Sequence, residues 1–276
     1  MIRSWRSSSL LAAPAIVLML LGLVLPSVVM LLSPPGTSLG DVLGRFGEVF
    51  TDGYERRIVV RTLTTALIVT GLCLLLGFPV AYLIARRPGR WAGPLLACAI
   101  FPLLLSTVVR TYGWLVVLGR NGVVGKVLVA LGIVDEAPQL LYTRVAVVLG
   151  LAQLFLPLAI VSCYSSVAQI DVGLDEAARG LGATRTRCLR SVVIPLAMPG
   201  IALATTLVFA GSITAYTTPY LLGGSRQRVL STQLFTYSSI SVDWAAASAT
   251  ALVMILLVVV ISGGFGSVAR RKGSSR

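Results

Sequence analysis

The sequence contains no histidine and few charged residues: only 12% of its 276 residues are Asp, Glu, Lys or Arg. Without histidine, the chain cannot form His-based catalytic triads, HExxH zinc sites or histidine proton relays. Its four cysteines form no CxxC pair, so neither a zinc site nor a disulfide framework is indicated. An intramembrane enzyme would need a nucleophile–base pair or paired aspartates within apolar segments, and the sequence offers neither.

The chain is instead rich in apolar residues, which make up 56% of it and give a mean hydropathy of +0.91. Soluble domains carry roughly a quarter charged residues, about twice the share found here. Several apolar runs reach or approach the ~20 residues that a helix needs to cross a bilayer core of about 30 Å. Because lipid offers the backbone no hydrogen-bond partners, such runs must be helical. The composition therefore predicts an all-α membrane protein.

Six apolar runs are interpreted as transmembrane helices. They cover residues 10–32, 58–85, 91–118, 145–167, 191–222 and 244–268. Pro94 and Pro102 are expected to kink the third run, and prolines also interrupt the fifth. Residues 119–143 are broken by glycine and charge, so they are not assigned as a span, and whether they enter the membrane is left open.

The first run follows Arg3 and Arg6, as the core of a signal peptide would. Such cores are usually roughly 7–15 residues long and end in a small-x-small site, whereas this run is longer and lacks one. We therefore expect a retained helix. The predicted organisation is an N-terminal cytoplasmic tail, first helix and external loop (1–57), a transmembrane core (58–268) and a basic cytoplasmic tail (269–276).

The net charge of +13 indicates topology rather than nucleic-acid binding, because no basic face is interleaved with aromatic residues. Lys and Arg in short loops accumulate on the cytoplasmic side of a membrane. With the N-terminus inside, the inner segments hold thirteen basic and three acidic residues, and the outer segments hold ten and seven. Both termini and the loop 170–190 are therefore expected in the cytoplasm.

The loop 170–190 has more regularity than a connector needs. Its apolar residues recur at helical spacing: Leu174, Ala177, Ala178 and Leu181. Gly182 is placed to end the helix in a left-handed cap, and Thr184 is placed to cap a second helix. By itself, this pattern fits either a helix lying on lipid headgroups or a helix against which another protein packs.

The detailed order of residues favours the second interpretation. Glu176-Ala177-Ala178 is followed after three residues by Gly182, and after nine more by Val192-x-Ile194-Pro195. This order resembles the EAA motif of ABC importer permeases, in which Ile and Leu stand at the two aliphatic positions. The resemblance implies a type I ABC importer permease fold, with a coupling helix between the fourth and fifth spans that docks on the ATPase. It assigns that contact to Glu176, Ala177, Ala178 and Gly182, and the end of the connector to Pro195.

Other stretches from about residue 58 onward resemble the permeases of spermidine/putrescine importers. They are residues 109–118, 120–124, 219–224 and 243–249. The resemblance implies a polyamine substrate, although importers of opines, aminophosphonates or ferric ion share these stretches. It also implies a bacterial inner membrane, a second homologous permease, two copies of an ATPase, an extracytoplasmic substrate-binding protein and contact with membrane lipid. ATP and Mg²⁺ would bind the ATPase, so no catalytic residue, metal or cofactor is expected in this chain.

A path for a flexible polycation would favour aromatic faces and carboxylates. Aromatic residues near the outer halves of the third and fifth spans are the candidates: Tyr112, Trp114, Phe209, Tyr216 and Tyr220. Each of them could equally belong to an interfacial aromatic belt or to helix packing. No carboxylate falls within a predicted span, which leaves recognition of a cation to the binding protein or the second permease.

An ATP-independent transporter or channel is the alternative from a different class. Such a protein would need ionisable residues inside its spans, or inverted repeats, and the sequence shows neither feature.

Overall fold

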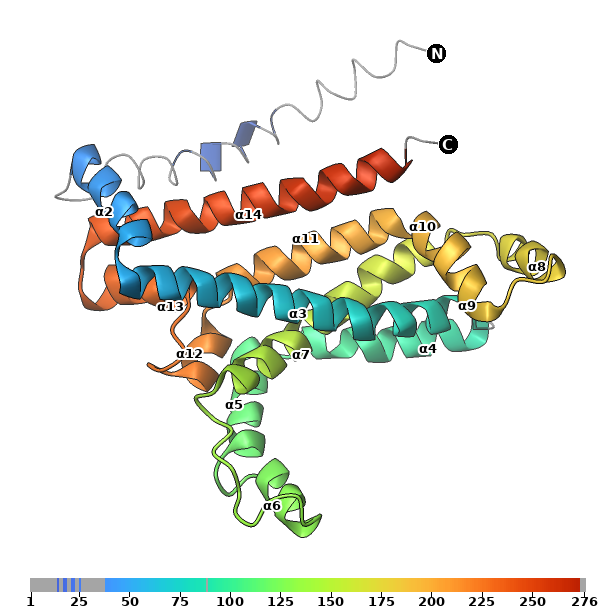
Figure 1. Cartoon of the computed structure of the whole chain (residues 1–276), viewed down its shortest axis with the longest axis horizontal. Coiled ribbons are helices and arrows are strands. Elements are labelled where there is room, and N and C mark those ends of the chain that lie inside the picture. The colour runs from blue at the N-terminus through green and yellow to red at the C-terminus, as the bar shows by residue number, and fades with distance from the viewer. Residues whose placement is uncertain are drawn as a thin grey trace. The chain divides into compact units, whose positions relative to one another are not determined.

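The computed structural model describes residues 38–87 and 89–273, together with residues 14, 17, 18, 21, 22 and 25. The predicted first span, residues 10–32, therefore lies mostly outside the described residues. Within the described part the regular structure is helical (Figure 1). In chain order it consists of α2 (Leu39–Thr51), α3 (Gly53–Ala85), α4 (Gly89–Ile100), the 3₁₀ helix η1 (Phe101–Leu104), α5 (Thr107–Leu118), α6 (Val123–Ala130), α7 (Arg144–Val167), α8 (Val172–Gly180), α9 (Arg185–Cys188), the π-helix η2 (Leu189–Val193), α10 (Ile194–Leu196), α11 (Met198–Thr214), α12 (Thr217–Gly223), α13 (Leu230–Phe235), the π-helix η3 (Thr236–Ile240) and α14 (Trp244–Gly273).

Among the described residues, four helical stretches are long and apolar enough to cross a membrane. They are Gly53–Ala85, Thr107–Ala130, Arg144–Val167 and Trp244–Gly264. A fifth is added if Arg185–Leu196 and Met198–Thr214, which meet at a bend of 70°, form one broken span. This result confirms the all-α membrane class and the predicted second, fourth and sixth spans. α3 begins five residues before the predicted second span, so its first turn includes Glu55.

The prediction of one kinked helix over residues 91–118 is wrong. The chain forms the shorter apolar helix Gly89–Leu104 and becomes extended at Leu105, where ψ is 139°, before α5 begins. Pro102 has no N–H, so one backbone hydrogen bond is missing where α4 tightens into the 3₁₀ turn η1. The membrane-length stretch is Thr107–Ala130, which includes α6. α6 occupies part of the 119–143 segment, which the sequence pattern leaves unassigned.

The predicted interruption of the fifth span is confirmed and begins one turn before Pro195. Because Pro195 has no backbone N–H, the helical ladder loses a bond here. The chain widens into η2, where the N–H of Ile194 reaches back to the carbonyl of Leu189. α10 ends at Leu196, and α11 starts at Met198 in the new direction.

α11 packs along α7, and glycines let the two helices approach closely. A Cβ on Gly200 would lie 2.6 Å from the backbone oxygen of Ser162, and a Cβ on Gly211 would overlap the ring of Phe155. Lipid tails are as apolar as side chains, so helices in a membrane associate through close packing rather than through the hydrophobic effect. These glycines are therefore part of what holds α7 and α11 together.

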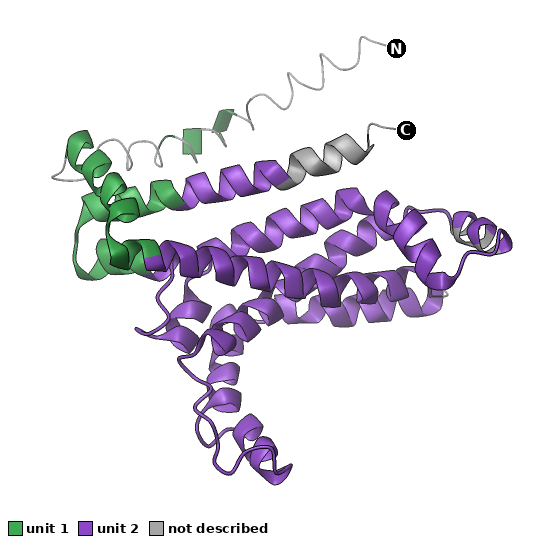
Figure 2. Ribbon diagram, in the orientation of Figure 1, with its two compact units in different colours: residues 1–56, 233–253 green, residues 57–232, 254–276 purple. Residues whose placement is uncertain are grey.

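The chain divides into two compact units (Figure 2). The larger comprises residues 57–232 and 254–276, and the smaller comprises residues 1–56 and 233–253. In the larger unit, α4, α7 and α11 run lengthwise (Figure 1). α8 lies beyond one end of these helices, and α5, α6 and α12 gather at the opposite end. The predicted cytoplasmic loop is thus separated from α6 and α12 by the length of the helices.

In the smaller unit, the predicted external loop contains a helix, α2, that begins with a capping box. Oγ of Ser38 accepts from the N–H of Asp41 at 3.3 Å, and the carboxylate of Asp41 accepts from the N–H of Ser38 at 2.8 Å. The hydrogen bonds from the backbone and side chain of Ser38 hold the pKa of Asp41 below its ordinary value. Farther along α2, Arg45 donates to Glu48 at 2.9 Å and to Asp243 at 3.1 Å.

Candidate functional site

The segment that resembles the EAA motif forms α8 and the turn after it. The carboxylate of Asp171 accepts from the N–H of Gly173 at 2.8 Å and so helps to start the helix. Gly182 has a φ of +83°, and the N–H of Ala183 reaches back to the carbonyl of Ala178 at 3.0 Å, which is the pattern of a Schellman cap. Thr184 accepts from the N–H of Arg187 at 3.3 Å and caps α9. Both caps predicted from the sequence are confirmed.

α8 and the turn that follows it expose apolar side chains that no other described part of the chain covers. Leu181 is 90% exposed and Leu174 is 47% exposed, and Ala177 between them is also exposed. Ala178 is half-buried. The side chain of Glu176 lies outside the described residues, and only its place within α8 is given. The helix thus has the small, partly apolar surface expected of a docking element.

The base of this segment is held firmly in the larger unit. Four residues form a buried cluster that joins the end of α7 to the start of α11: Val167, Ile170, Val193 and Ala197. Phe78 and Tyr82 of α3 pack against it. Pro195, predicted to end the connector, lies inside α10 and is exposed, two residues before the bend at Ala197. The rigid part of the connector therefore extends slightly beyond Pro195.

The five aromatic candidates for a substrate path lie in different environments. Tyr112 is 56% exposed and Tyr220 is 47% exposed, while Phe209 is fully buried in α11. The rings of Tyr216 and Tyr220 lie 5.1 Å apart between centroids. The burial of Phe209 gives it a packing contact, and a role of the others in a path stays a prediction.

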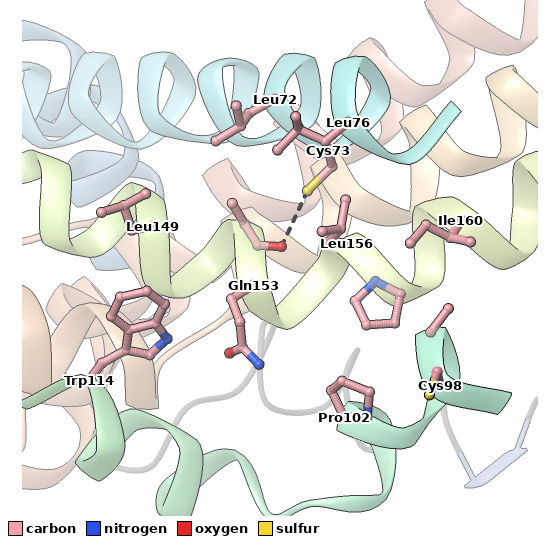
Figure 3. Close-up of a pocket in the computed structure, with 13 residues that line it drawn as sticks. Leu72, Cys73, Leu76, Cys98, Pro102, Trp114, Leu149, Gln153, Leu156 and Ile160 are labelled. Carbon is pink, nitrogen blue, oxygen red and sulfur yellow. Dashed lines mark hydrogen bonds between the residues drawn. The ribbon is translucent and has the colours of Figure 1, made fainter. Parts of the chain in front are cut away.

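Trp114 lines an apolar cavity of about 370 Å³ between α3, α4, α5 and α7 (Figure 3). Leu72, Leu76 and Ile160 form part of its wall, and Gln153 reaches from α7 into the space between Trp114 and Pro102 (Figure 3). The thiol of Cys73 donates to the carbonyl of Ala152 at 3.5 Å. Cys73 and Cys98 line the cavity as small side chains.

The prediction that no carboxylate lies in a spanning helix is wrong, because Glu55 belongs to the first turn of α3 and is only 8% exposed. It accepts hydrogen bonds from Tyr237 and Gln233, which follow the fifth span in sequence. One signal in the sequence could have found it: Glu55 lies one helical turn before the apolar run, where an acidic side chain favours the start of a helix.

Taken together, membrane-length helices and a short exposed helix between two of them fit a component of a membrane transport system. A family model for the inner membrane component of binding-protein-dependent transport systems matches residues 74–273. The chain belongs to this family and is the permease subunit of an ABC importer.

Relatives in sequence agree with this assignment, and solved structures agree with the fold. The chain is 31% identical to the spermidine/putrescine transport system permease protein PotB of Escherichia coli, over 75% of this chain and 78% of that protein. It is 30% identical to the molybdenum transport system permease protein ModB of Mycobacterium tuberculosis, over 80% of this chain and 83% of that one. Its fold is similar to a chain of a bacterial alginate ABC transporter in complex with an alginate-bound periplasmic protein, with a TM-score of 0.75 and 20% identity. That likeness covers 98% of this chain and 95% of the other.

Proposed function

We propose that this permease carries a polyamine across the inner membrane and couples to a separate ATPase through α8. The single observation that carries the coupling role is the exposed apolar face of α8, held on a rigid base at one end of the larger unit. A helix fixed by a Schellman cap, a threonine cap and a buried cluster transmits force better than a mobile loop would. By the EAA resemblance, Glu176, Ala177, Ala178 and Gly182 form the contact, and Pro195 ends the connector.

The proposed topology places both termini and α8 in the cytoplasm. The excess of basic residues in the inner segments supports this orientation. α6 and α12, at the end of the larger unit opposite α8, then face the extracytoplasmic side, where a binding protein would dock. Residues 58–268 form the transmembrane core, and residues 1–57 and 269–276 are the flanking segments.

The proposed assembly contains this chain, a second homologous permease, two ATPase subunits and a substrate-binding protein. ATP and Mg²⁺ bind only the ATPase subunits. When these close on ATP, they move the coupling helices, and the cavity between the two permeases changes from outward to inward access. Lipid surrounds the remaining apolar faces.

A polyamine is proposed as the substrate because the chain covers 78% of the length of the spermidine/putrescine permease PotB at 31% identity. The buried carboxylate of Glu55 also supports a cationic substrate, because a buried negative charge favours a positive partner.

An oxyanion is the second candidate substrate, favoured by the likeness to ModB and by two arginines. Arg110 and Arg144 each keep two guanidinium nitrogens buried without a hydrogen-bond partner within residues 38–87 and 89–273. Such nitrogens would suit an anion such as molybdate.

The test of coupling is co-purification of the tagged chain with its ATPase and second permease from native membranes, using Glu176→Lys. Glu136→Lys, which changes an exposed acid in the loop between α6 and α7, is the matched control. We expect the ATPase to be lost only from the Glu176 variant, while the second permease is retained. Equal recovery of ATPase with both variants would show that α8 is not the docking element.

The test of substrate uses the complex in liposomes with its binding protein. Spermidine-loaded binding protein should stimulate ATP hydrolysis and uptake, whereas molybdate or ferric ion should not. If molybdate alone stimulates ATP hydrolysis and uptake, the substrate is an oxyanion and the polyamine proposal is wrong.

A further inference from the structure

A carboxylate in the smaller unit is buried with half of its hydrogen-bonding capacity unused. Oε1 of Glu55 accepts from the hydroxyl of Tyr237 at 2.5 Å and from Nε2 of Gln233 at 3.3 Å. Oε2 of Glu55 is also buried, yet it has no partner among the described residues. Because a buried acceptor without a donor is costly, by about 1–3 kcal/mol or more for a charged group, a donor from outside the described residues is expected here.

A small cavity lies beside Glu55. It measures about 30 Å³, which is enough for one group the size of a water molecule. Glu48 and Tyr237 also line it, together with Arg45 and small residues of α14. Near it, Oε1 of Gln233, whose side chain is 3% exposed, is a second buried acceptor without a partner in the described part of the chain.

The charges around the cavity favour a cation. Two carboxylates, those of Glu48 and Glu55, line the cavity together with the guanidinium of Arg45. Arg45 donates to Glu48 at 2.9 Å and to Asp243 at 3.1 Å, so its charge is balanced by those two groups. The carboxylate of Glu55 is left without a cationic partner among the residues described here.

A group that fits here donates hydrogen bonds and is about as large as water, and the unpaired carboxylate of Glu55 favours one with positive charge. A primary ammonium group meets all three conditions, since it has three N–H donors and no acceptor. A resident metal ion is a poorer match, because the described residues bring together no group of three or more Cys, Asp or Glu that could hold one.

We propose that Glu55, supported by Gln233 and Tyr237, is a binding site for a primary ammonium group, such as each end of a polyamine carries. Binding of the ammonium group follows from the geometry of the smaller unit, whereas its role in import rests on the proposed polyamine substrate. Tyr237 holds the carboxylate in place by donating to Oε1. Burial and this hydrogen bond raise the pKa of Tyr237 to about 12, so its hydroxyl remains a donor at neutral pH.

The first experiment tests ammonium binding without any transport. The melting temperature of the purified permease–ATPase complex is measured with ethylammonium chloride and with tetramethylammonium chloride at equal ionic strength. Both ions carry one positive charge, but only ethylammonium has N–H donors. We expect ethylammonium alone to raise the melting temperature, and Glu55→Gln to abolish that rise. Equal effects of the two salts, or an unchanged rise in the variant, would overturn the site.

The second experiment tests the role of the site in import. Glu55→Gln should lower spermidine uptake about tenfold, the loss expected for one charge-assisted hydrogen bond, while loaded binding protein still stimulates ATP hydrolysis. Glu55→Asp should restore part of the uptake, and Glu136→Gln should have no effect. If Glu55 were only a structural latch, Tyr237→Phe, which keeps the charge, would lower uptake as much as Glu55→Gln does. That result, or normal uptake by Glu55→Gln, would contradict the proposal.

The two proposals can fail separately. If the wild-type complex imports no polyamine but is stabilised by ethylammonium through Glu55, the substrate assignment is wrong and the site remains. If the wild type imports polyamine and Glu55→Gln imports it equally well, the substrate assignment remains and the site is wrong.

Discussion

Nη1 of Arg86 donates to the backbone carbonyl of Ile170 at 3.0 Å, which joins the end of α3 to the turn that leads into α8. The ring of Tyr82 lies below the same guanidinium, 5.8 Å from Cζ to the ring centroid. Ile170 is itself buried in the cluster that connects α7 to α11. The turn before α8 is therefore fixed to three helices of the larger unit, and we expect a displacement of α8 to be passed on to all of them.

The first prediction concerns this connection. Arg86→Ala removes a charge-assisted hydrogen bond worth about 1.5–3 kcal/mol, so the turn at Ile170 loosens while α8 keeps its own surface. We expect the ATPase still to co-purify, with transport per ATP hydrolysed reduced severalfold. The control is Arg87→Ala, which removes a neighbouring exposed arginine of the same charge. Equal transport-to-ATP ratios for both variants would show that the Arg86 bond carries no coupling.

The second prediction concerns the two glycines at the end of α8, Gly180 and Gly182, and tests whether the left-handed backbone of Gly182 is needed for docking. A Cβ on Gly180 or Gly182 would meet no described atom within 4 Å, but only Gly182 has a positive φ, of +83°. Gly182→Ala should therefore strain the cap by about 1–2 kcal/mol, whereas Gly180→Ala should be neutral or stabilising. ATPase co-purification should fall with Gly182→Ala and vanish with Gly182→Asp, which also places a charge in the contact. Normal recovery with Gly182→Asp would argue against docking at this turn.

Local signals in the sequence predicted the turn after α8 correctly. They did not predict contacts between segments that lie far apart in the chain. The cap at Gly182 and the cap at Thr184 follow from backbone chemistry within a few residues, and both are present in the structure. The helix breaks at Leu105 because it tightens around Pro102. The spacing of apolar residues does not indicate such a break. The pairing of Glu55 with Tyr237 joins residues 182 positions apart. No local pattern at Glu55 indicates that partner, so a single sequence assigns the residue to a loop.

The third prediction is an alkaline titration of Tyr237. The ordinary pKa of tyrosine is about 10. Burial and the hydrogen bond to Glu55 raise the pKa of Tyr237 to about 12. Between these two values the unfolded chain binds fewer protons than the folded chain, so stability falls as pH rises. The contribution of Tyr237 is fully present below about pH 10 and is lost as pH rises through about 12.

Absorbance of phenolate measures this titration directly. The difference between wild type and Tyr237→Phe should show one tyrosine ionising near pH 12. Tyr112, which is 56% exposed, provides the comparison through Tyr112→Phe. A Tyr237 difference centred at pH 10 would mean that its hydroxyl is neither buried nor bonded to Glu55 in the membrane protein.

The fourth prediction tests the close approach of α7 and α11. A methyl group on Gly200 would lie 2.6 Å from the carbonyl oxygen of Ser162, and a backbone atom cannot turn aside as a flexible side chain can. Gly200→Ala should therefore push the helices apart and cost about 1–3 kcal/mol. Gly71→Ala in α3, where a Cβ would meet no described atom within 4 Å, is the matched control and should be neutral or stabilising because alanine favours a helix. Thermal melting in detergent compares the two. If Gly200→Ala melts at or above the wild-type temperature, the two helices are not packed through this glycine.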